Sequence, residues 1–351
     1  MMERQHRDAT KVAIVGCGIR GRLFGTALSQ SPEAKVIAVA DTDIAKARAL
    51  ASSIGATGYG TVEELVDRHP ELDAAIIATP DFLHVDAAVA CASRELQLMI
   101  EKPLATDVAS ARRIAQHAAA NGARVMVAFE NRWNPRFIEA RRLIDDGALG
   151  RVSNLIGHLD DTLFVPTRML PWAGRSSPAW FLMPHTLDLA LWFTGAVPVR
   201  VYAQGTRGVL EGRGIPTWDA ITALFTLSDG STATLHSSWI LPEGRPAVFD
   251  MRYEIQGHEG TLAIEGAGHG LTLYGQDKAT WPQLGVHTWR DGLRGFPVDM
   301  VNDFVRFAGG EEIAVPQARD GVIVTAAIDA VHRSLESGVA ISFTEDDLLA
   351  T

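Results

Sequence analysis

The sequence predicts an α/β domain with a doubly wound parallel sheet, followed by an α+β domain with an open, mostly antiparallel sheet. Three observations carry this prediction. Short apolar runs alternate with helical windows over the first third of the chain, a glycine-rich turn follows the first run, and later runs succeed one another with turns between them. A chain of 351 residues with 47% hydrophobic content is long enough for two cores.

The first domain is predicted from runs that are apolar on both faces, as buried parallel strands are. These strand candidates are Lys11–Val15, Lys35–Ala40, Ala74–Ala78, Leu96–Ile100 and Arg124–Phe129. The helical windows that separate or follow them are Arg20–Gln30, Asp43–Ser53, Val62–Asp67, Leu83–Arg94 and Asp107–Asn121. Right-handed crossovers through such helices bring the strands together as a parallel sheet.

The second domain is predicted from runs without helices between them. These runs are Val199–Thr206, Ala220–Leu227, Ser231–Trp239, Arg252–Gln256 and Thr261–Ile264. Asp229-Gly230 is a hairpin signal because both residues tolerate positive φ, which favours antiparallel pairing. The helical windows of this half are Trp180–Thr194, Asp299–Phe307 and Gly321–Ser337. We place the boundary near Phe129, with one domain at 10–129 and the other at 130–351.

A G-x-G-x-x-G turn follows the first strand candidate. Its first glycine permits a tight turn, its second lets the backbone approach a pyrophosphate, and its third allows close helix–strand packing. The cofactor-binding candidates at this turn are Gly16, Gly18, Ile19, Arg20 and Gly21. Asp41 lies 20 residues beyond the last glycine, at the end of the second strand, where an acid accepts hydrogen bonds from a ribose. This context predicts a Rossmann-type site for a nicotinamide dinucleotide.

Asp41 also bears on the choice of cofactor. A carboxylate at this position repels a 2′-phosphate, and the next residues, Thr42 and Asp43, provide no arginine to bind one. NAD is therefore favoured over NADP.

Lys102 follows the strand candidate Leu96–Ile100, within Glu101-Lys102-Pro103. Ligands of open α/β sheets bind outside the carboxyl ends of the strands, and Pro103 cannot continue the strand ladder. A lysine there can hydrogen-bond a substrate hydroxyl and stabilise alkoxide charge. Its position alone fits a solvated surface lysine equally well.

Several motifs extend over nearly the whole chain. They are GCGIRG at 16–21, ATPDFLH at 78–84, EKPLA at 101–105, ENRWNPRF at 130–137, LIDDGALGRV at 143–152 and HTLDLALWFTG at 185–195. Together they resemble the glucose–fructose oxidoreductase, inositol dehydrogenase and rhizopine-catabolism (Gfo/Idh/MocA) family. The resemblance implies an N-terminal Rossmann domain for NAD or NADP and a C-terminal domain whose open sheet often serves as an oligomer interface. It also implies a sugar, sugar acid or cyclic polyol as substrate.

The resemblance implies roles for individual residues. Lys102 and His185 become the catalytic candidates, and Asp188 becomes a residue that orients the imidazole or binds substrate. The residues implied to line the nicotinamide side are Thr79, Pro80, His84, Glu101, Lys102 and Asn131. An imidazole titrates near pH ~6.5 and a lysine near ~10.4, so His185 is the better base and Lys102 is assigned to polarising the substrate oxygen.

One position departs from the family pattern. Many dehydrogenase members carry an aspartate four residues before the histidine, and here that position is Phe181. The carboxylate that would bind a substrate hydroxyl is therefore missing, which bears on polyol specificity.

The segment Asp160–Trp180 is polar, contains prolines and is weakly periodic, so we expect an irregular wall of the substrate site. The substrate-binding candidates in it are Arg168, Trp172, Arg175 and Trp180. Indole faces stack on sugar rings and guanidinium groups bind carboxylates, although ordinary loop packing explains these residues equally well.

Charge and composition exclude several classes of protein. A formal net charge of −10 disfavours nucleic acids and anionic membranes as partners. The absence of a long apolar run or signal peptide predicts a cytoplasmic protein. Cys17 and Cys91 are expected to be reduced, and no His, Cys or acid spacing predicts a metal site.

The leading hypothesis is an NAD(P)-dependent dehydrogenase or reductase that acts on a secondary alcohol of a sugar, sugar acid or cyclic polyol. A homo-oligomer, dimer or tetramer, is expected. Two alternatives stay open, an NAD-dependent glycoside hydrolase of the same fold and a non-catalytic, nucleotide-sensing regulator.

Overall fold

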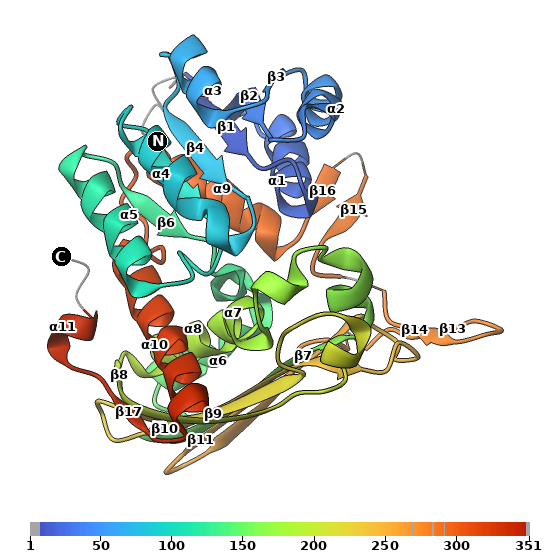
Figure 1. Cartoon of the computed structure of the whole chain (residues 1–351), viewed down its shortest axis with the longest axis vertical. Helices are drawn as coiled ribbons and strands as arrows, with labels where there is room; N and C mark the ends of the chain where they lie inside the picture. The colour runs from blue at the N-terminus through green and yellow to red at the C-terminus, as the bar shows by residue number, and fades with distance from the viewer. Residues whose placement is uncertain (1–7, 269, 283, 291, 349–351) are drawn as a thin grey trace. The chain divides into compact units, whose positions relative to one another are not determined.

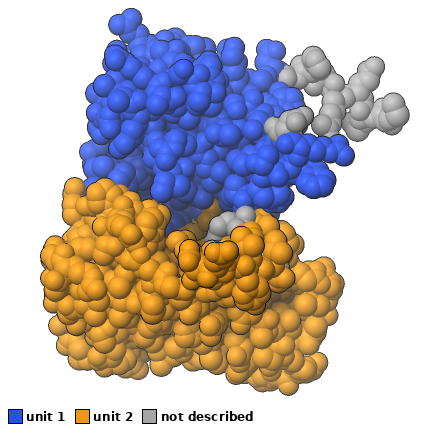
Figure 2. Space-filling model, turned by 90° about the vertical axis from the view of Figure 1, so that its right-hand side faces the viewer, with its two compact units in different colours: residues 1–128, 285–322, 350–351 blue, residues 129–284, 323–349 orange. Residues whose placement is uncertain are grey.

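The computed structural model describes residues 8–268, 270–282, 284–290 and 292–348. The chain divides into two compact units, shown in different colours in Figure 2. Unit 1 comprises 1–128 and 285–322, with the last two residues, and unit 2 comprises 129–284 and 323–349. The chain first passes from unit 1 to unit 2 between Ala128 and Phe129. Residues 285–322 belong to unit 1, whereas the sequence prediction includes them in the second domain.

Unit 1 contains a six-stranded sheet in the order β3-β2-β1-β4-β5-β6, with every pair parallel. Its strands are β1 (Thr10–Val15), β2 (Ala34–Ala40), β3 (Thr57–Tyr59), β4 (Ala74–Ile77), β5 (Gln97–Ile100) and β6 (Val125–Val127). The central strands are apolar and buried on both faces, because helices cover the sheet on each side. The predicted doubly wound parallel sheet is confirmed, and β3 is an edge strand that the sequence did not reveal.

The helices of unit 1 form two groups on the two faces of this sheet (Figure 1). One group is α1 (Ile19–Ser29), α2 (Ile44–Ile54) and α9 (Phe296–Ala308), and the other is α3 (Val62–Arg68), α4 (His84–Ala92) and α5 (Val108–Ala120). A hairpin of β15 (His287–Trp289) and β16 (Gly292–Arg294) lies against α1. The contacts of α9 with α1 and β5 are the reason that residues 285–322 join this unit.

Unit 2 is built on a seven-stranded sheet in the order β12-β11-β7-β10-β9-β8-β17. Its strands are β7 (Val152–Thr162), β8 (Pro198–Thr206), β9 (Ala220–Leu227), β10 (Thr232–Leu241), β11 (Phe249–Gly257), β12 (Thr261–Glu265) and β17 (Ile341–Ser342). The pair β7–β10 is parallel and the other pairs of this sheet are antiparallel, which confirms the predicted mostly antiparallel sheet. A short hairpin, β13 (Leu273–Tyr274) and β14 (Ala279–Thr280), follows β12.

The sequence prediction missed β7, which is an interior strand of this sheet, between β11 and β10. Asp160 and Asp161 were assigned to an irregular segment, but they belong to β7 and pair with Asp250 and Phe249 of β11. The correction has a simple cause. Acids are rare in buried strands, but Arg245 and Arg252, which form ion pairs with the adjacent Asp250, also lower the cost of burying Asp160.

Helices cover one face of the unit 2 sheet (Figure 1). They are α6 (Pro135–Asp145), α7 (Pro178–Phe181), α8 (Met183–Thr194) and α10 (Ala318–Ser337), while α11 (Glu345–Leu348) ends the described chain. The predicted helix over Trp180–Thr194 is interrupted at Leu182, because Pro184 has no N–H with which to continue the hydrogen-bond ladder. In the part of the chain that the structure describes, the opposite face of the sheet carries no helix.

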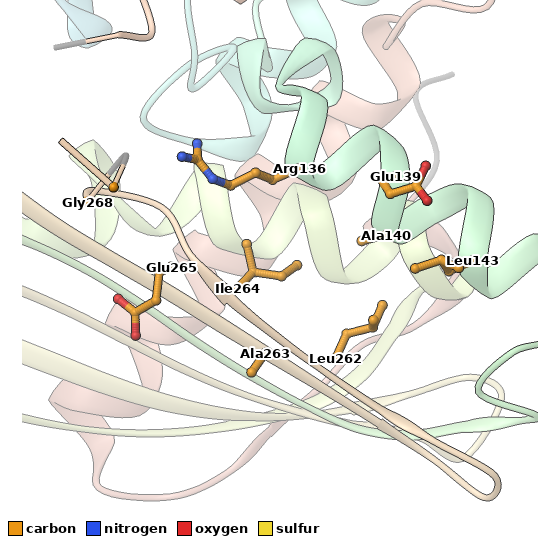
Figure 3. Close-up of a pocket in the computed structure, with 10 residues that line it drawn as sticks. Arg136, Glu139, Ala140, Leu143, Leu262, Ala263, Ile264, Glu265 and Gly268 are labelled. Carbon is orange, nitrogen blue, oxygen red and sulfur yellow. The ribbon is translucent and has the colours of Figure 1, made fainter.

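A groove in unit 2 lies between α6 and the edge strand β12 (Figure 3). Arg136 and Glu139 of α6 line it on one side, and Leu262 and Ile264 of β12 point toward the helix from the other. None of the site residues predicted from the sequence lines this groove. It is therefore separate from the candidate site described next.

Candidate active site

The cofactor candidates of unit 1 follow the carboxyl ends of β1, β2, β4 and β5, which lie at one edge of the parallel sheet. Gly16 has φ +95°, and a Cβ added to Gly21 would lie 1.8 Å from the Gly16 carbonyl oxygen. These two glycines are required by the turn itself. Gly18 differs, because a Cβ added there would meet no atom within 4 Å. It begins α1, so it leaves open space at the helix N-terminus, beside the exposed Ile19.

Asp41 stands at the end of β2 with its carboxylate held by the backbone. Oδ2 accepts a hydrogen bond from Cys17 N at 2.8 Å, and Oδ1 accepts one from Asp43 N at 2.8 Å. A carboxylate has about four lone-pair positions, so the half-buried Asp41 keeps acceptor capacity for ribose hydroxyls. Burial and the nearby Asp41 raise the pKa of the Cys17 thiol to about 12. Cys17 is therefore a protonated, buried packing residue, and so is Cys91, whose pKa burial also raises to about 12.

The loop after β4 carries Thr79 and Pro80. The Thr79 hydroxyl is buried and has no hydrogen-bond partner among the described residues. An orphaned hydroxyl at the carboxyl end of a Rossmann strand fits a polar group of a bound dinucleotide. Together with the space at Gly18 and the Asp41 carboxylate, it indicates that these residues fit NAD.

His84 was expected to line the nicotinamide side, but the structure buries it completely. Its Nδ1 lies 2.9 Å from the Pro103 carbonyl oxygen and its Nε2 lies 3.1 Å from the Thr79 carbonyl oxygen. Burial lowers the pKa of His84, against the nearby Asp81 and Glu101, which raise it. His84 thus braces the loop after β4 against the loop after β5.

The loop after β5 is tied to the glycine turn. Arg20 Nε donates to Glu101 Oε1 at 2.6 Å, and Lys102 N donates to Glu101 Oε2 at 3.3 Å. The Glu101 side chain is 9% exposed and that of Arg20 29% exposed, so the pair is largely shielded from water. Lys102 itself is half-buried, and its peptide bond to Pro103 is cis. The Glu101 carboxylate therefore binds Arg20 and the backbone N–H of Lys102.

In unit 2, His185 lies in the first turn of α8 and is half-buried. Its Nδ1 lies 3.5 Å from Nδ2 of Asn131, which is buried in the 3-10 helix η2 (Glu130–Trp133). The structure thus brings together two residues that the sequence predicts separately, 54 positions apart.

Asp188 lies one turn further along α8 and is 1% exposed. Arg132 holds both of its oxygens, with Nε donating to Oδ2 at 3.0 Å and Nη2 donating to Oδ1 at 2.6 Å. Little of this carboxylate is left for a substrate hydroxyl. Burial, and next the Asp188 carboxylate, raise the pKa of Tyr253, whose hydroxyl donates to the Thr186 carbonyl oxygen at 3.0 Å. The sequence analysis did not predict a role for Arg132. The residue lies within the ENRWNPRF motif, but no sequence spacing links it to position 188.

The predicted wall residues separate in the structure. Arg168 forms an exposed ion pair with Glu243, and Arg175 is exposed in η4 (Ala173–Arg175). Trp180 stacks on His332 with ring centroids 5.1 Å apart and an interplanar angle of 11°. Arg168 and Trp180 are predicted to bind substrate, but in the structure both side chains already have partners within the protein.

The side chains of Phe181 and Trp172, by contrast, pack against each other. Their ring centroids lie 5.8 Å apart in an edge-to-face arrangement, and the Phe181 ring also lies 5.8 Å from that of Trp239. Trp239 is fully buried, and its indole N–H has no acceptor among the described residues. We call Trp172, Phe181 and Trp239 the aromatic wall. Trp239 lies on β10, 58 residues beyond Phe181, so the sequence provided no signal for it.

Over residues 8–348 without 269, 283 and 291, no three His, Cys, Asp or Glu side chains gather as metal ligands. No helix in this part is both long and apolar enough to cross a membrane.

A Rossmann sheet with this glycine turn and Asp41 defines the class of an NAD-binding protein, and comparisons with known proteins agree. The model of the oxidoreductase family with an NAD-binding Rossmann fold matches residues 10–129, and the Gfo/Idh/MocA C-terminal domain matches residues 137–263. The chain belongs to the Gfo/Idh/MocA family of oxidoreductases. The predicted family, fold class and NAD cofactor are confirmed.

The relatives are similar over most of their length. Inositol 2-dehydrogenase of Rhizobium meliloti is 26% identical over 95% of this chain and 98% of its own. The myo-inositol dehydrogenase Hyg17 of Streptomyces leeuwenhoekii is 30% identical over 72% of this chain and 75% of its own. The crystal structure of myo-inositol 2-dehydrogenase from Lactobacillus plantarum has a TM-score of 0.82 at 20% identity, over 96% of this chain and 100% of that one, and shows the shared fold.

Proposed function

We propose that this protein is an NAD-dependent dehydrogenase that oxidises a secondary alcohol of a cyclic polyol or sugar, with 10–129 as its cofactor domain. The observation that carries the proposal is the held, half-buried His185 on α8, in a chain whose relatives are named inositol dehydrogenases over nearly their whole length. An imidazole next to a buried amide is a suitable base for a hydroxyl proton.

Residues of unit 1 are proposed to hold the cofactor. The N-terminus of α1 at Gly18 would receive the pyrophosphate, Asp41 the ribose hydroxyls, and Thr79 a polar group further along the dinucleotide. NAD, when bound, supplies the hydride acceptor. Asp41 would also repel a 2′-phosphate, so NADP is expected to bind more weakly.

The proton chemistry is proposed for side chains of the chain itself. Lys102 would donate a hydrogen bond to the substrate oxygen and stabilise the charge that develops there. His185 would accept the hydroxyl proton, and the 3.5 Å contact between Asn131 Nδ2 and His185 Nδ1 would help to hold the imidazole in place. Asp188 would act through Arg132 to position α8.

The test is formation of NADH, followed by absorbance, with a panel of inositols, sugars and sugar acids. Lys102→Ala and His185→Ala are expected to lower kcat by about 10²–10⁴-fold while NAD still binds. Lys35→Ala is the matched control, because Lys35 is exposed near the start of β2, at the other end of the strand from Asp41. Full activity of Lys102→Ala or His185→Ala would contradict the assigned roles.

An aryl glycoside added to this panel, together with a measurement of NAD binding, tests the two alternatives. Release of sugar from an aryl glycoside without net NADH would indicate the glycoside hydrolase. Tight NAD binding without turnover of any compound in the panel would indicate the regulator.

We also propose a cytoplasmic homo-oligomer, a dimer or tetramer. Support comes from the face of the unit 2 sheet opposite its helices, where Tyr202 and Leu224 sit opposite each other on neighbouring strands and are 39% and 48% exposed. Light scattering coupled to size-exclusion chromatography measures the mass, and Leu224→Lys is expected to lower it.

A further inference from the structure

Phe181 lies one helical turn before His185. Leu182, between α7 and α8, keeps a right-handed helical backbone, and His185 N donates to the Leu182 carbonyl oxygen at 3.1 Å. Four residues along a helix correspond to a rise of about 6 Å, so Phe181 is within reach of a six-membered ring whose alcohol is bound at His185.

We propose that the aromatic wall at Phe181 selects a ring that lacks a hydroxyl, or carries an apolar group, about one helical turn from the alcohol that is oxidised. The proposal rests on the proposed function, because it names the substrate class for that same site. The expected substrate differs from a fully hydroxylated inositol or sugar at the ring position that faces Phe181.

The position of Phe181 is strongly held. Ser177 begins α7 and accepts a hydrogen bond from Trp180 N at 3.1 Å, while its hydroxyl donates to His332 Nε2 at 2.8 Å. The other ring nitrogen of His332 donates to the Ile328 carbonyl oxygen at 2.9 Å, which leaves Nε2 as the acceptor. Phe181 N closes this turn by donating to the Ser177 carbonyl oxygen at 2.9 Å. The aromatic wall is thus presented by an anchored turn.

No acid on α7 or α8 replaces the missing carboxylate. Asp188 is the acid in residues 178–194, and Arg132 holds both of its oxygens. A substrate hydroxyl placed against the half-buried rings of Phe181 and Trp172 would lose hydrogen bonds to water without a carboxylate in return. A C–H or other apolar group at the same place would gain contact with the rings instead.

The experiment compares matched pairs of alcohols in the NADH assay with the full chain. The pairs are myo-inositol with its monodeoxy analogues and D-glucose with its 4-deoxy and 6-deoxy analogues. In the wild type, kcat/KM for one deoxy member is expected to exceed that of its parent by about tenfold, mainly through KM. In Phe181→Asp the preference is expected to reverse in favour of the parent.

Phe181→Leu is the matched variant, since it keeps an apolar side chain and is expected to retain the wild-type preference for the deoxy member. If Phe181→Asp does not fold, as thermal melting would reveal, the wild type and Phe181→Leu still decide the question. Turnover of parents and deoxy analogues with equal kcat/KM would overturn this proposal while supporting the proposed function. Absence of NADH formation with every compound would instead overturn the proposed function.

Discussion

Arg20 in the glycine turn donates from Nε to Glu101 Oε1 at 2.6 Å, which ties the turn after β1 to the loop after β5. Two segments proposed for different tasks, cofactor binding and polarisation of the substrate oxygen, therefore share one ion pair. Because the Glu101 side chain is only 9% exposed, solvent screens this pair weakly.

Breaking this pair is expected to weaken both tasks. Arg20→Ala leaves the shielded Glu101 carboxylate without its guanidinium, so we expect a loss of about 1–3 kcal/mol in stability. The dissociation constant of NAD, measured by calorimetry, should rise together with a fall in kcat. Arg94→Ala is the control, because its pair with Asp67 is exposed. A change in NAD affinity without a change in kcat would disprove the coupling.

Substitution by alanine is expected to affect NAD affinity at one glycine of the turn and fold stability at another. Gly18→Ala meets no atom within 4 Å and its φ is −72°, so the melting temperature should change little. NAD affinity should fall, because the methyl group occupies the space in front of α1. Gly21→Ala would place a Cβ 1.8 Å from the Gly16 carbonyl oxygen, so we expect it to destabilise the fold by about 1–3 kcal/mol or more.

Wild-type NAD affinity in a correctly folded Gly18→Ala protein would show that the open space is not used by the cofactor. The two measurements, thermal melting and NAD binding, separate a folding defect from a binding defect in either variant.

Removal of Arg132 is expected to destabilise unit 2. The pair with Asp188 is shielded, with side chains 14% and 2% exposed, and an unpaired buried carboxylate costs about 3–5 kcal/mol. Chemical denaturation measures the loss. Arg142→Ala, whose ion pairs with Glu139 and Asp146 are exposed to solvent, should cost far less. Equal effects of the two substitutions would show that the Arg132 pair has no special role.

Acid is expected to destabilise the protein through His332. Burial lowers the pKa of this imidazole below its ordinary value of 6.5. Between 6.5 and the lower folded value, the unfolded chain binds a proton that the folded chain does not, so stability is full above this window and falls as the pH drops through it. His332→Gln should therefore show a shallower fall in melting temperature between pH 8 and pH 5. An unchanged slope would disprove this assignment.

Asp160 is expected to show the opposite dependence. Burial and the neighbouring Asp250 raise the pKa of its carboxyl to about 7, from an ordinary value of 3.8. The folded chain then holds a proton that the unfolded chain releases between these values, so this contribution to stability grows as the pH falls from 7. Asp160→Asn should stabilise the protein most at pH 8, and its gain in melting temperature should shrink with acid.

Sequence patterns were sufficient for the central strands and helices of unit 1, although not for β3 or for residues 285–322. Its strands are short, buried on both faces and separated by helices, so each element leaves a local signal, and the glycine turn and Asp41 lie within one strand–helix–strand unit. In unit 2 the signals were weaker. β7 mixes His158 and Asp160 with apolar residues, because one face of the sheet is polar, and the segment was read partly as a loop.

The Rossmann sheet and the NAD cofactor were predictable from the sequence, because they depend on residues that are close together or on motifs of fixed spacing. The two catalytic candidates followed from the family resemblance and stay a prediction. Only the tertiary structure decided which side chains meet across long separations. It paired Arg20 with Glu101, Arg132 with Asp188, and Phe181 with Trp239. The reason is physical, since an ion pair or a ring contact depends on where the folded backbone brings two positions, and no local pattern encodes that distance.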